Sequence, residues 1–129
     1  MKAVFFETAP WERRYLSRAL KATRLRAQFI AEPLTEASIA HAQGADVLSV
    51  FIYSTLTKAV VTKLRNTRLI ATRSTGFDHV DLKACAQRKI LVANVPAYGE
   101  NTVAEHTFAL ILSLSRNVHK AYVRTVRGD

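Results

Sequence analysis

The sequence predicts an α/β protein: a flavodoxin-like, doubly wound sheet of five parallel strands in the order 2-1-3-4-5, with a long C-terminal helix. Short apolar runs alternate with helical patterns along the chain, and each expected strand is followed by a helix. Strands joined through helices pair in parallel, with right-handed crossovers. With 129 residues, 49% of them hydrophobic, the chain is long enough for one domain with a core, and this size favours the flavodoxin-like order.

The expected strands are short apolar stretches that end at polar residues. The first, KAVFFE, is apolar and aromatic, which is typical of a buried strand. The second, LRAQFI, is more polar, so we expect it at an edge of the sheet. The strands are expected over residues 2–7, 25–30, 46–52, 68–72 and 90–95.

Local signals place the helices between these strands. Pro10 suits the first turn of a helix, in which Trp11 and Tyr15 fall on one face. Thr35 is expected to cap the second helix, and Gly44 to end it in a left-handed conformation. The helices are expected over residues 10–22, 34–44, 56–66, 81–89 and 101–127.

The last helix has two features of its own. Thr102 and Glu105 form a Thr-x-x-Glu pattern, which predicts a capping box at its start. Residues 103–114 (VAEHTFALILSL) are apolar around more than one face, and a helix of this kind needs cover on several sides. We therefore expect a homodimer formed through the helix at 101–126.

Composition limits the classes of partner. The net charge is +9, but the basic residues are scattered from Arg13 to Arg127 without a dense block, which favours a solvated surface over a nucleic-acid site. Cys85 is the only cysteine, so no disulfide framework exists and a cytoplasmic location is expected. The N-terminal apolar run is too short for a signal peptide, and no stretch has the roughly 18 apolar residues of a membrane span.

In sheets of this type ligands bind outside the carboxyl ends of the strands. Among these loops, RSTGFDHVD (73–81) combines a glycine with hydroxyl and carboxylate side chains. Gly76 would allow a positive φ or a close approach of the backbone to a ligand, and neighbouring N–H groups would form an anion-binding concavity. Asp78 or Asp81 would cap the next helix. Taken alone, the loop is better explained as a purely structural turn between a strand and a helix. The loops at this edge are 7–10, 53–56, 73–79 and 95–101.

The stretches RSTGFDHVDL and ILVANVPAYGENTVAEHTFALILSLSR resemble the D-isomer-specific 2-hydroxyacid dehydrogenases. In that family a strand ends in a glycine loop followed by Asp and a Val-Asp pair, and the next strand leads to Asn-Val-Pro and a Val-Ala-Glu-His helix. The resemblance is specific over 71–116 and continues in register over 1–70. Tyr98 points to the D-lactate dehydrogenase branch.

The resemblance implies a substrate-binding domain at 1–100, and a helix at 101–129 that leads into a nucleotide-binding domain. It also implies the substrate site: the N–H groups of Thr75 and Gly76 would hold the carboxylate of a 2-oxo acid. Tyr98 would place a phenol at the pocket, and Tyr53 would line the end that takes the substrate side chain. The implied reaction is the NAD-dependent one in which a pyruvate-like 2-oxo acid is reduced with hydride from the reduced nicotinamide cofactor.

The chain offers no residues for the other parts of that reaction. Its glycines form no G-x-G-x-x-G pattern, which a dinucleotide needs for close approach of the backbone. No catalytic, cofactor-binding or metal-binding residue is therefore assigned, and the chain alone is expected to bind no NAD and to be inactive. His106 is interpreted as a packing or capping residue. The glycines are Gly44, Gly76, Gly99 and Gly128.

Other functions fit less well. A receiver domain needs an Asp at the end of the third strand, where this chain reads VFIYST. A flavodoxin-type FMN site needs a Ser/Thr-rich loop after the first strand, and ETAPWE is not one. The open alternative is a stand-alone, non-catalytic, oligomerising α/β module.

Overall fold

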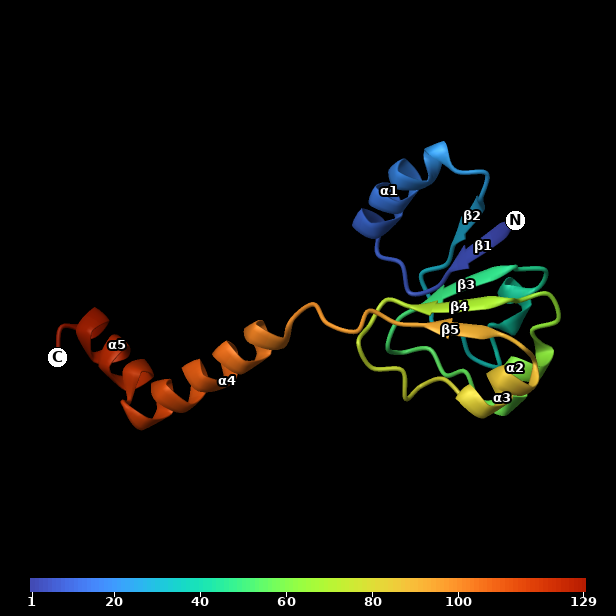
Figure 1. Ribbon diagram of the computed structural model, residues 1–129. Coiled ribbons are helices and arrows are strands. Elements are labelled where there is room, and N and C mark those ends of the chain that lie inside the picture. Colours follow the sequence, from blue (N-terminus) through green and yellow to red (C-terminus); the bar gives the residue numbers. More distant parts are fainter. The chain divides into compact units, whose positions relative to one another are not determined.

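Five strands pair in parallel in the order β2-β1-β3-β4-β5 in the computed structural model, which describes residues 1–129 (Figure 1). This order confirms the predicted fold class, and β2 lies at an edge as expected. The strands are shorter than predicted because each keeps only the residues that enter the hydrogen-bonded ladder. Their bounds are β1 Lys2–Phe5, β2 Arg26–Phe29, β3 Val47–Val50, β4 Leu69–Thr72 and β5 Leu91–Ala93.

The chain forms two compact units, Met1–Pro96 and Ala97–Asp129, and each is described by itself. The first unit holds the sheet and three α-helices. The crossover from β1 to β2 runs in the opposite direction to those from β3 to β4 and β5, so right-handed connections put α1 on one face and α2 and α3 on the other. Figure 1 shows this arrangement. The helices are α1 Pro10–Ala19, α2 Lys58–Lys63 and α3 Leu82–Gln87.

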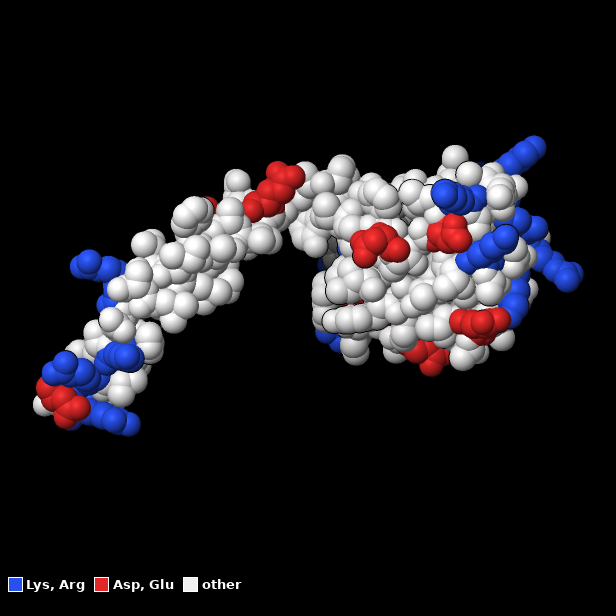
Figure 2. Space-filling view, turned by 90° about the horizontal axis from the view of Figure 1, so that it is seen from below, with Lys and Arg blue, Asp and Glu red and all other residues white.

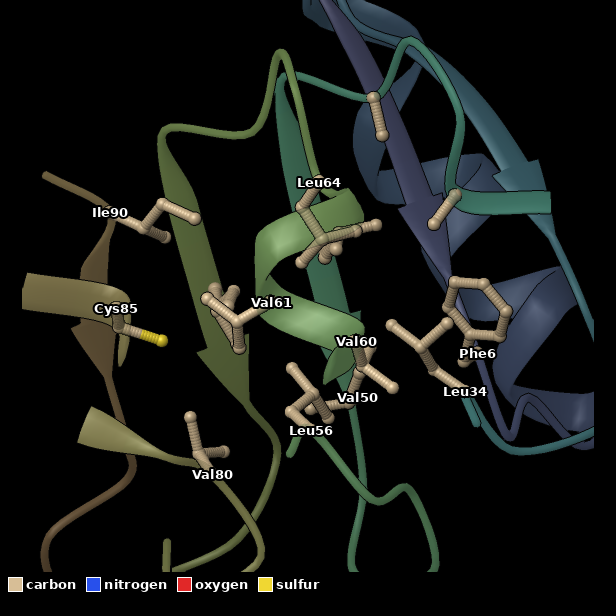
Figure 3. Packing of buried hydrophobic residues seen from close by; sticks show 14 of the residues in the cluster. Phe6, Leu34, Val50, Leu56, Val60, Val61, Leu64, Val80, Cys85 and Ile90 are labelled. Atoms are coloured by element: carbon tan, nitrogen blue, oxygen red, sulfur yellow. The ribbon is translucent and has the colours of Figure 1, made fainter. Parts of the chain in front are cut away.

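The hydrophobic core lies between the sheet and the α2–α3 layer. Val4, Leu48 and Ile70 are register partners on β1, β3 and β4, and all three are fully buried. Figure 3 shows the side chains of Val60 and Val61 projecting from α2 into the same cluster. Burial of this apolar surface is the main force that holds the strands in register.

Cys85 of α3 belongs to this core. Burial, with a smaller contribution from the Asp81 carboxylate, raises the pKa of its thiol. The thiol is therefore protonated at neutral pH and packs as a small apolar group.

The opposite face of the sheet is covered differently. Phe5 and Phe29, which are register partners on β1 and β2, stack with their ring centroids 5.3 Å apart. The Arg13 guanidinium of α1 lies 6.0 Å from the centroid of the Phe29 ring. Trp11 and Tyr15, which share a face of α1, remain 64% and 69% exposed. The aromatic face of α1 is therefore mostly exposed, and Arg13 is a side chain of α1 that lies over β2.

The predicted helix at 34–44 is wrong. This segment forms turns and a short 3-10 helix, η2, at Ile39–Ala42. Thr35 does not act as an N-cap: its N–H donates to Ser38 Oγ at 2.9 Å, and that hydroxyl donates to the Pro33 carbonyl at 2.7 Å. Such side-chain-to-backbone bonds offer the backbone an alternative to helical bonding. Gly44 has a φ of +70°, which confirms the predicted left-handed conformation.

The second unit contains two helices, α4 Glu100–Ser115 and α5 Val118–Arg127, where the sequence predicts one. Asn117 separates them with a left-handed φ of 53°, a conformation that Asn tolerates better than most residues. The predicted capping box is also wrong. The N-cap of α4 is Gly99, and Thr102 and Glu105 lie inside the helix.

The structure decides which carboxylate of the loop at 73–81 caps α3. Asp81 Oδ1 accepts a hydrogen bond of 2.9 Å from the N–H of Ala84, whereas Asp78 is exposed and caps nothing. We predict that Asp81→Ala lowers the free energy of unfolding by about 0.5–2 kcal/mol. Asp78→Ala, the matched control, should change it by less than about 0.5 kcal/mol. Urea denaturation measures both values, and equal losses would contradict the assignment.

Candidate functional site

Three loops meet at the carboxyl edge of the sheet. β1, β3 and β4 are parallel neighbours, so the segments that follow Phe5, Val50 and Thr72 leave the sheet at the same edge. In open α/β sheets this is the edge where ligands bind. The candidate site is therefore built from the start of each loop.

The loop after β4 leaves several backbone donors unused, because none of the N–H groups of residues 74–79 donates to an acceptor within the protein. Ser74 Oγ donates to the Gly76 carbonyl at 2.7 Å, Asn94 Nδ2 donates to the Thr75 carbonyl at 2.8 Å, and the Val95 N–H donates to the Ser74 carbonyl at 3.1 Å. The carbonyls of this turn are thus bonded within the protein. The N–H groups of Thr75 and Gly76 donate to no protein acceptor, and both residues are exposed. Adjacent unpaired N–H groups can bind an anion.

Gly76 does not adopt an unusual backbone conformation. Its φ lies outside the left-handed region, so the positive φ that a glycine would allow here is not used. A Cβ at this position would lie 3.1 Å from Asp78 Oδ1, the end of an exposed side chain, so a small shift of that carboxylate would accommodate it.

Glu7, directly after β1, organises the loop after β3. Its carboxylate accepts hydrogen bonds from the N–H of Phe51 at 2.8 Å and from the N–H of Tyr53 at 2.7 Å, and it also accepts the hydroxyl proton of Ser54. Its backbone is left-handed, with a φ of 54°. That conformation costs a non-glycine residue about 1–2 kcal/mol, so the surrounding bonds must hold it in place.

Arg73, directly after β4, ties the same loops together. Its Nη2 donates to the carbonyls of Phe6 and Glu7 at 2.8 and 3.0 Å, and its Nη1 donates to Ser49 Oγ at 3.0 Å. Its Nε lies 3.5 Å from Glu12 Oε1, which is ion-pair distance without hydrogen-bond geometry. Both side chains of this pair are about one-fifth exposed, so solvent screens the interaction only in part.

The four predicted site residues fall in different parts of the structure. Thr75 and Gly76 lie together in the loop after β4, and Tyr53 lies in the neighbouring loop after β3, where its N–H is bound by Glu7. The Tyr53 side chain is 71% exposed. Tyr98 belongs to the second unit, precedes α4 and is 69% exposed. Thr75, Gly76 and Tyr53 thus lie at one edge of the sheet, whereas Tyr98 belongs to the other compact unit.

Sequence reasoning missed Glu7 and Arg73. The available signal was a charged residue placed directly after an apolar strand, in ETAP and RSTG. Glu7 was interpreted as the polar end of the first strand, and Arg73 as the first residue of the loop at 73–81. Nothing in the sequence indicates that residues 7, 51–54 and 73 share one network, because the partners are 44 to 67 positions apart.

Other chemistry finds no matching site. No group of three or more His, Cys, Asp and Glu side chains is arranged to hold a metal ion. His106 is an exposed residue of α4. None of the helices is both long enough and apolar enough to traverse a lipid bilayer. Figure 2 shows Lys and Arg side chains interspersed with Asp and Glu over the first unit, without a continuous basic band on this face.

Comparison with known proteins identifies related sequences. The family model described as "D-isomer specific 2-hydroxyacid dehydrogenase, catalytic domain" matches residues 3–127. The chain is 36% identical over 132 residues to 2-hydroxyacid dehydrogenase homolog 1 of Schizosaccharomyces pombe, covering 100% of this chain and 40% of that protein. It is 31% identical over 127 residues to D-lactate dehydrogenase of Escherichia coli, covering 97% of this chain and 39% of that protein.

Solved structures agree. The structure of D-lactate dehydrogenase from Aquifex aeolicus, complexed with NAD and lactic acid, matches with a TM-score of 0.83 and 34% identity, over 97% of this chain and 37% of that one. The pyruvate reductase of Chlamydomonas reinhardtii matches with a TM-score of 0.78 and 32% identity, over 99% of this chain and 38% of that one. The chain therefore spans about 40% of the length of the relatives it matches.

Proposed function

This chain belongs to the D-isomer-specific 2-hydroxyacid dehydrogenase family, and we propose that it forms the substrate-binding part of an NAD-dependent D-2-hydroxyacid dehydrogenase. The proposed substrates are small 2-oxo acids of the pyruvate type, which are reduced to D-2-hydroxy acids such as D-lactate. Relatives named D-lactate dehydrogenase and pyruvate reductase support this substrate class. The observation that carries the proposal is the run of unused N–H groups in the loop after β4, among which the family resemblance singles out those of Thr75 and Gly76.

These two donors suit the carboxylate of a 2-oxo acid. Backbone amides are neutral and do not titrate, so they orient the anion without exchanging protons with the reacting carbonyl. In this proposal Tyr98 supplies a phenol at the pocket, and Tyr53 lines the end that receives the substrate side chain. Each tyrosine can combine apolar contact with one hydrogen bond.

The residues present do not fit a dinucleotide. The four glycines lie at positions 44, 76, 99 and 128, and none forms part of a glycine-rich turn between a strand and a helix. A backbone approach to pyrophosphate needs such a turn. We therefore propose that the nicotinamide cofactor, which in its reduced form NADH would supply the hydride, and the proton-transfer groups are held outside these 129 residues. The chain by itself would then be inactive, and we place the enzyme in the cytoplasm.

We further propose that the chain forms a homodimer through the helical segment at 101–126. No residue of α4 is buried, and Figure 2 shows a surface with few charged side chains along most of this helix. Large exposed apolar patches on a protein mark an interaction site. The same surface would serve a stand-alone oligomerising module, which is the alternative function. The exposed apolar side chains of α4 are Val103, Phe108, Leu110, Ile111, Leu112 and Leu114.

The enzymatic proposal predicts a division of labour that can be measured. The chain alone should neither bind NAD nor reduce pyruvate, whereas its fusion to the nucleotide-binding domain of a family member should do both. In the fusion, Tyr98→Phe should raise the KM for pyruvate about three- to tenfold, because one hydrogen bond contributes about 0.5–1.5 kcal/mol. The Kd of NAD should stay unchanged. Tyr15→Phe on α1, where the side chain is also 69% exposed, is the matched control.

Reduction of pyruvate by the 129-residue chain alone would refute the proposed division. An unchanged KM in the Tyr98→Phe fusion would remove Tyr98 from the substrate site.

The dimer proposal predicts a mass of twice 14.4 kDa in sedimentation equilibrium at micromolar concentration. Leu110→Glu combined with Leu114→Glu should dissociate the dimer, since burying each leucine contributes roughly 1.5–3 kcal/mol and a buried carboxylate would be unpaired. Leu91→Glu, at an equally exposed leucine of β5, should leave the mass unchanged. A monomeric mass across the concentration range would contradict the homodimer proposal.

A further inference from the structure

We infer that Glu7 is a positioning residue of the candidate site, whose carboxylate fixes segment 51–54 at the ligand-binding edge of the sheet. The inference rests on the proposed function and deepens it, because it names the group that sets the geometry of one wall of the proposed substrate site. Glu7 itself is placed in contact with the loop and not with the substrate.

Both oxygens of the Glu7 carboxylate accept hydrogen bonds from one short segment, residues 51–54. One oxygen, Oε1, accepts the N–H of Tyr53, and the other, Oε2, accepts both the N–H of Phe51 and the hydroxyl of Ser54. The direction of the last bond is fixed because a carboxylate can only accept, so Ser54 Oγ donates its proton to Glu7 while it accepts the N–H of Leu34 at 2.9 Å. Hydrogen bonds to an ionised acceptor are stronger than neutral ones.

The backbone conformation of Glu7 costs free energy, so the carboxylate is held in its position against local strain. Its φ of 54° is a conformation that glycine adopts freely and glutamate does not. Strained positions of this kind persist where surrounding structure enforces them, and they cluster at functional sites. The enforcing group here is Arg73, which donates to the Phe6 and Glu7 carbonyls.

Arg73 also connects the segment to the anion-binding turn. It follows Thr72, the last residue of β4, and stands two residues before Thr75, so the same chain segment that holds Glu7 continues into the unused N–H groups. The geometry of 51–54 and that of 75–76 are therefore set relative to each other through Glu7 and Arg73. A substrate held at 75–76 would meet the 51–54 wall at a fixed distance.

Two substitutions in the full chain separate the carboxylate from the backbone. Glu7→Gly removes the carboxylate and relieves the left-handed strain, whereas Glu7→Ala removes the carboxylate and keeps the strain. Glu7→Gln keeps the size of the side chain and serves if the smaller variants fail to fold. Glu36→Ala is the control, because Glu36 is exposed and its carboxylate pairs with Lys63 only.

The readouts are amide hydrogen exchange without ligand and the dissociation constant of pyruvate from ligand-observed NMR. In Glu7→Gly we expect at least tenfold faster exchange at Phe51 and Tyr53, unchanged exchange at the core residues Leu48 and Ile70, and a pyruvate Kd raised about tenfold. Glu7→Gln should show the same changes to a smaller extent. Glu36→Ala should match the wild type in both measurements.

The inference is overturned if the Phe51 and Tyr53 amides keep their protection in every Glu7 variant. It is equally overturned if Glu7→Gly loses that protection but binds pyruvate like the wild type, because the carboxylate would then serve stability alone. A wild-type chain that does not bind pyruvate contradicts the proposed function and, with it, a role for Glu7 in substrate binding. The exchange data, recorded without ligand, distinguish this failure from the other two.

Discussion

Parallel pairing of β3 with β1 on one side and with β4 on the other is the constraint on which the candidate site depends. The register sets Phe5, Ser49 and Ala71 side by side, so the three strands end at nearly the same level. The ladder continues past their ends: the Phe6 N–H donates to the Ser49 carbonyl at 2.9 Å, and the Arg73 N–H donates to the Val50 carbonyl at 2.8 Å. Residues 7, 51 and 73 therefore emerge together.

The polar groups at the carboxyl edge are of two kinds: those with a hydrogen-bond partner in the protein and those without one. Three donors of segment 51–54, the N–H groups of Phe51 and Tyr53 and the hydroxyl of Ser54, are paired with Glu7, and the guanidinium of Arg73 is paired with main-chain carbonyls. Polar groups that are partly removed from water need such partners, and these bonds make the edge rigid. The N–H groups of Thr75 and Gly76 are left without a partner on the solvent side. A rigid frame around unpaired donors is the arrangement expected of an anion site.

The sequence was sufficient for the sheet because each strand is a short apolar run and each connection is long enough for a crossover. It was insufficient where local polar chemistry competes with helix formation. Ser38 Oγ accepts the N–H of Thr35 and donates to the Pro33 carbonyl, which gives this segment an alternative to helical bonding, and Asn117 breaks the final helix in a conformation that few residues tolerate. The spacing of apolar residues along the sequence indicates neither of these two effects.

Of the candidate site, only the positions of the loops could be predicted from the sequence. Gly76 and its neighbours could be placed from the strand pattern and the family resemblance, since both point to the carboxyl edge. Glu7 and Arg73 could not be found this way, because their roles arise from partners brought together by the sheet register and not from any spacing along the chain. The exposed tyrosines are a third case: Tyr53 and Tyr98 owe their proposed roles to the resemblance alone.

The most direct test of this account is a map of the amides that respond to a 2-oxo acid. Heteronuclear NMR spectra of the isotopically labelled chain, titrated with oxamate as an unreactive analogue of pyruvate, report each amide separately. The account predicts saturable shifts at Thr75 and Gly76 that share one dissociation constant, with the Gly44 and Gly128 amides unchanged. Saturable binding that leaves the Thr75 and Gly76 amides unmoved, or no binding at all, would contradict it.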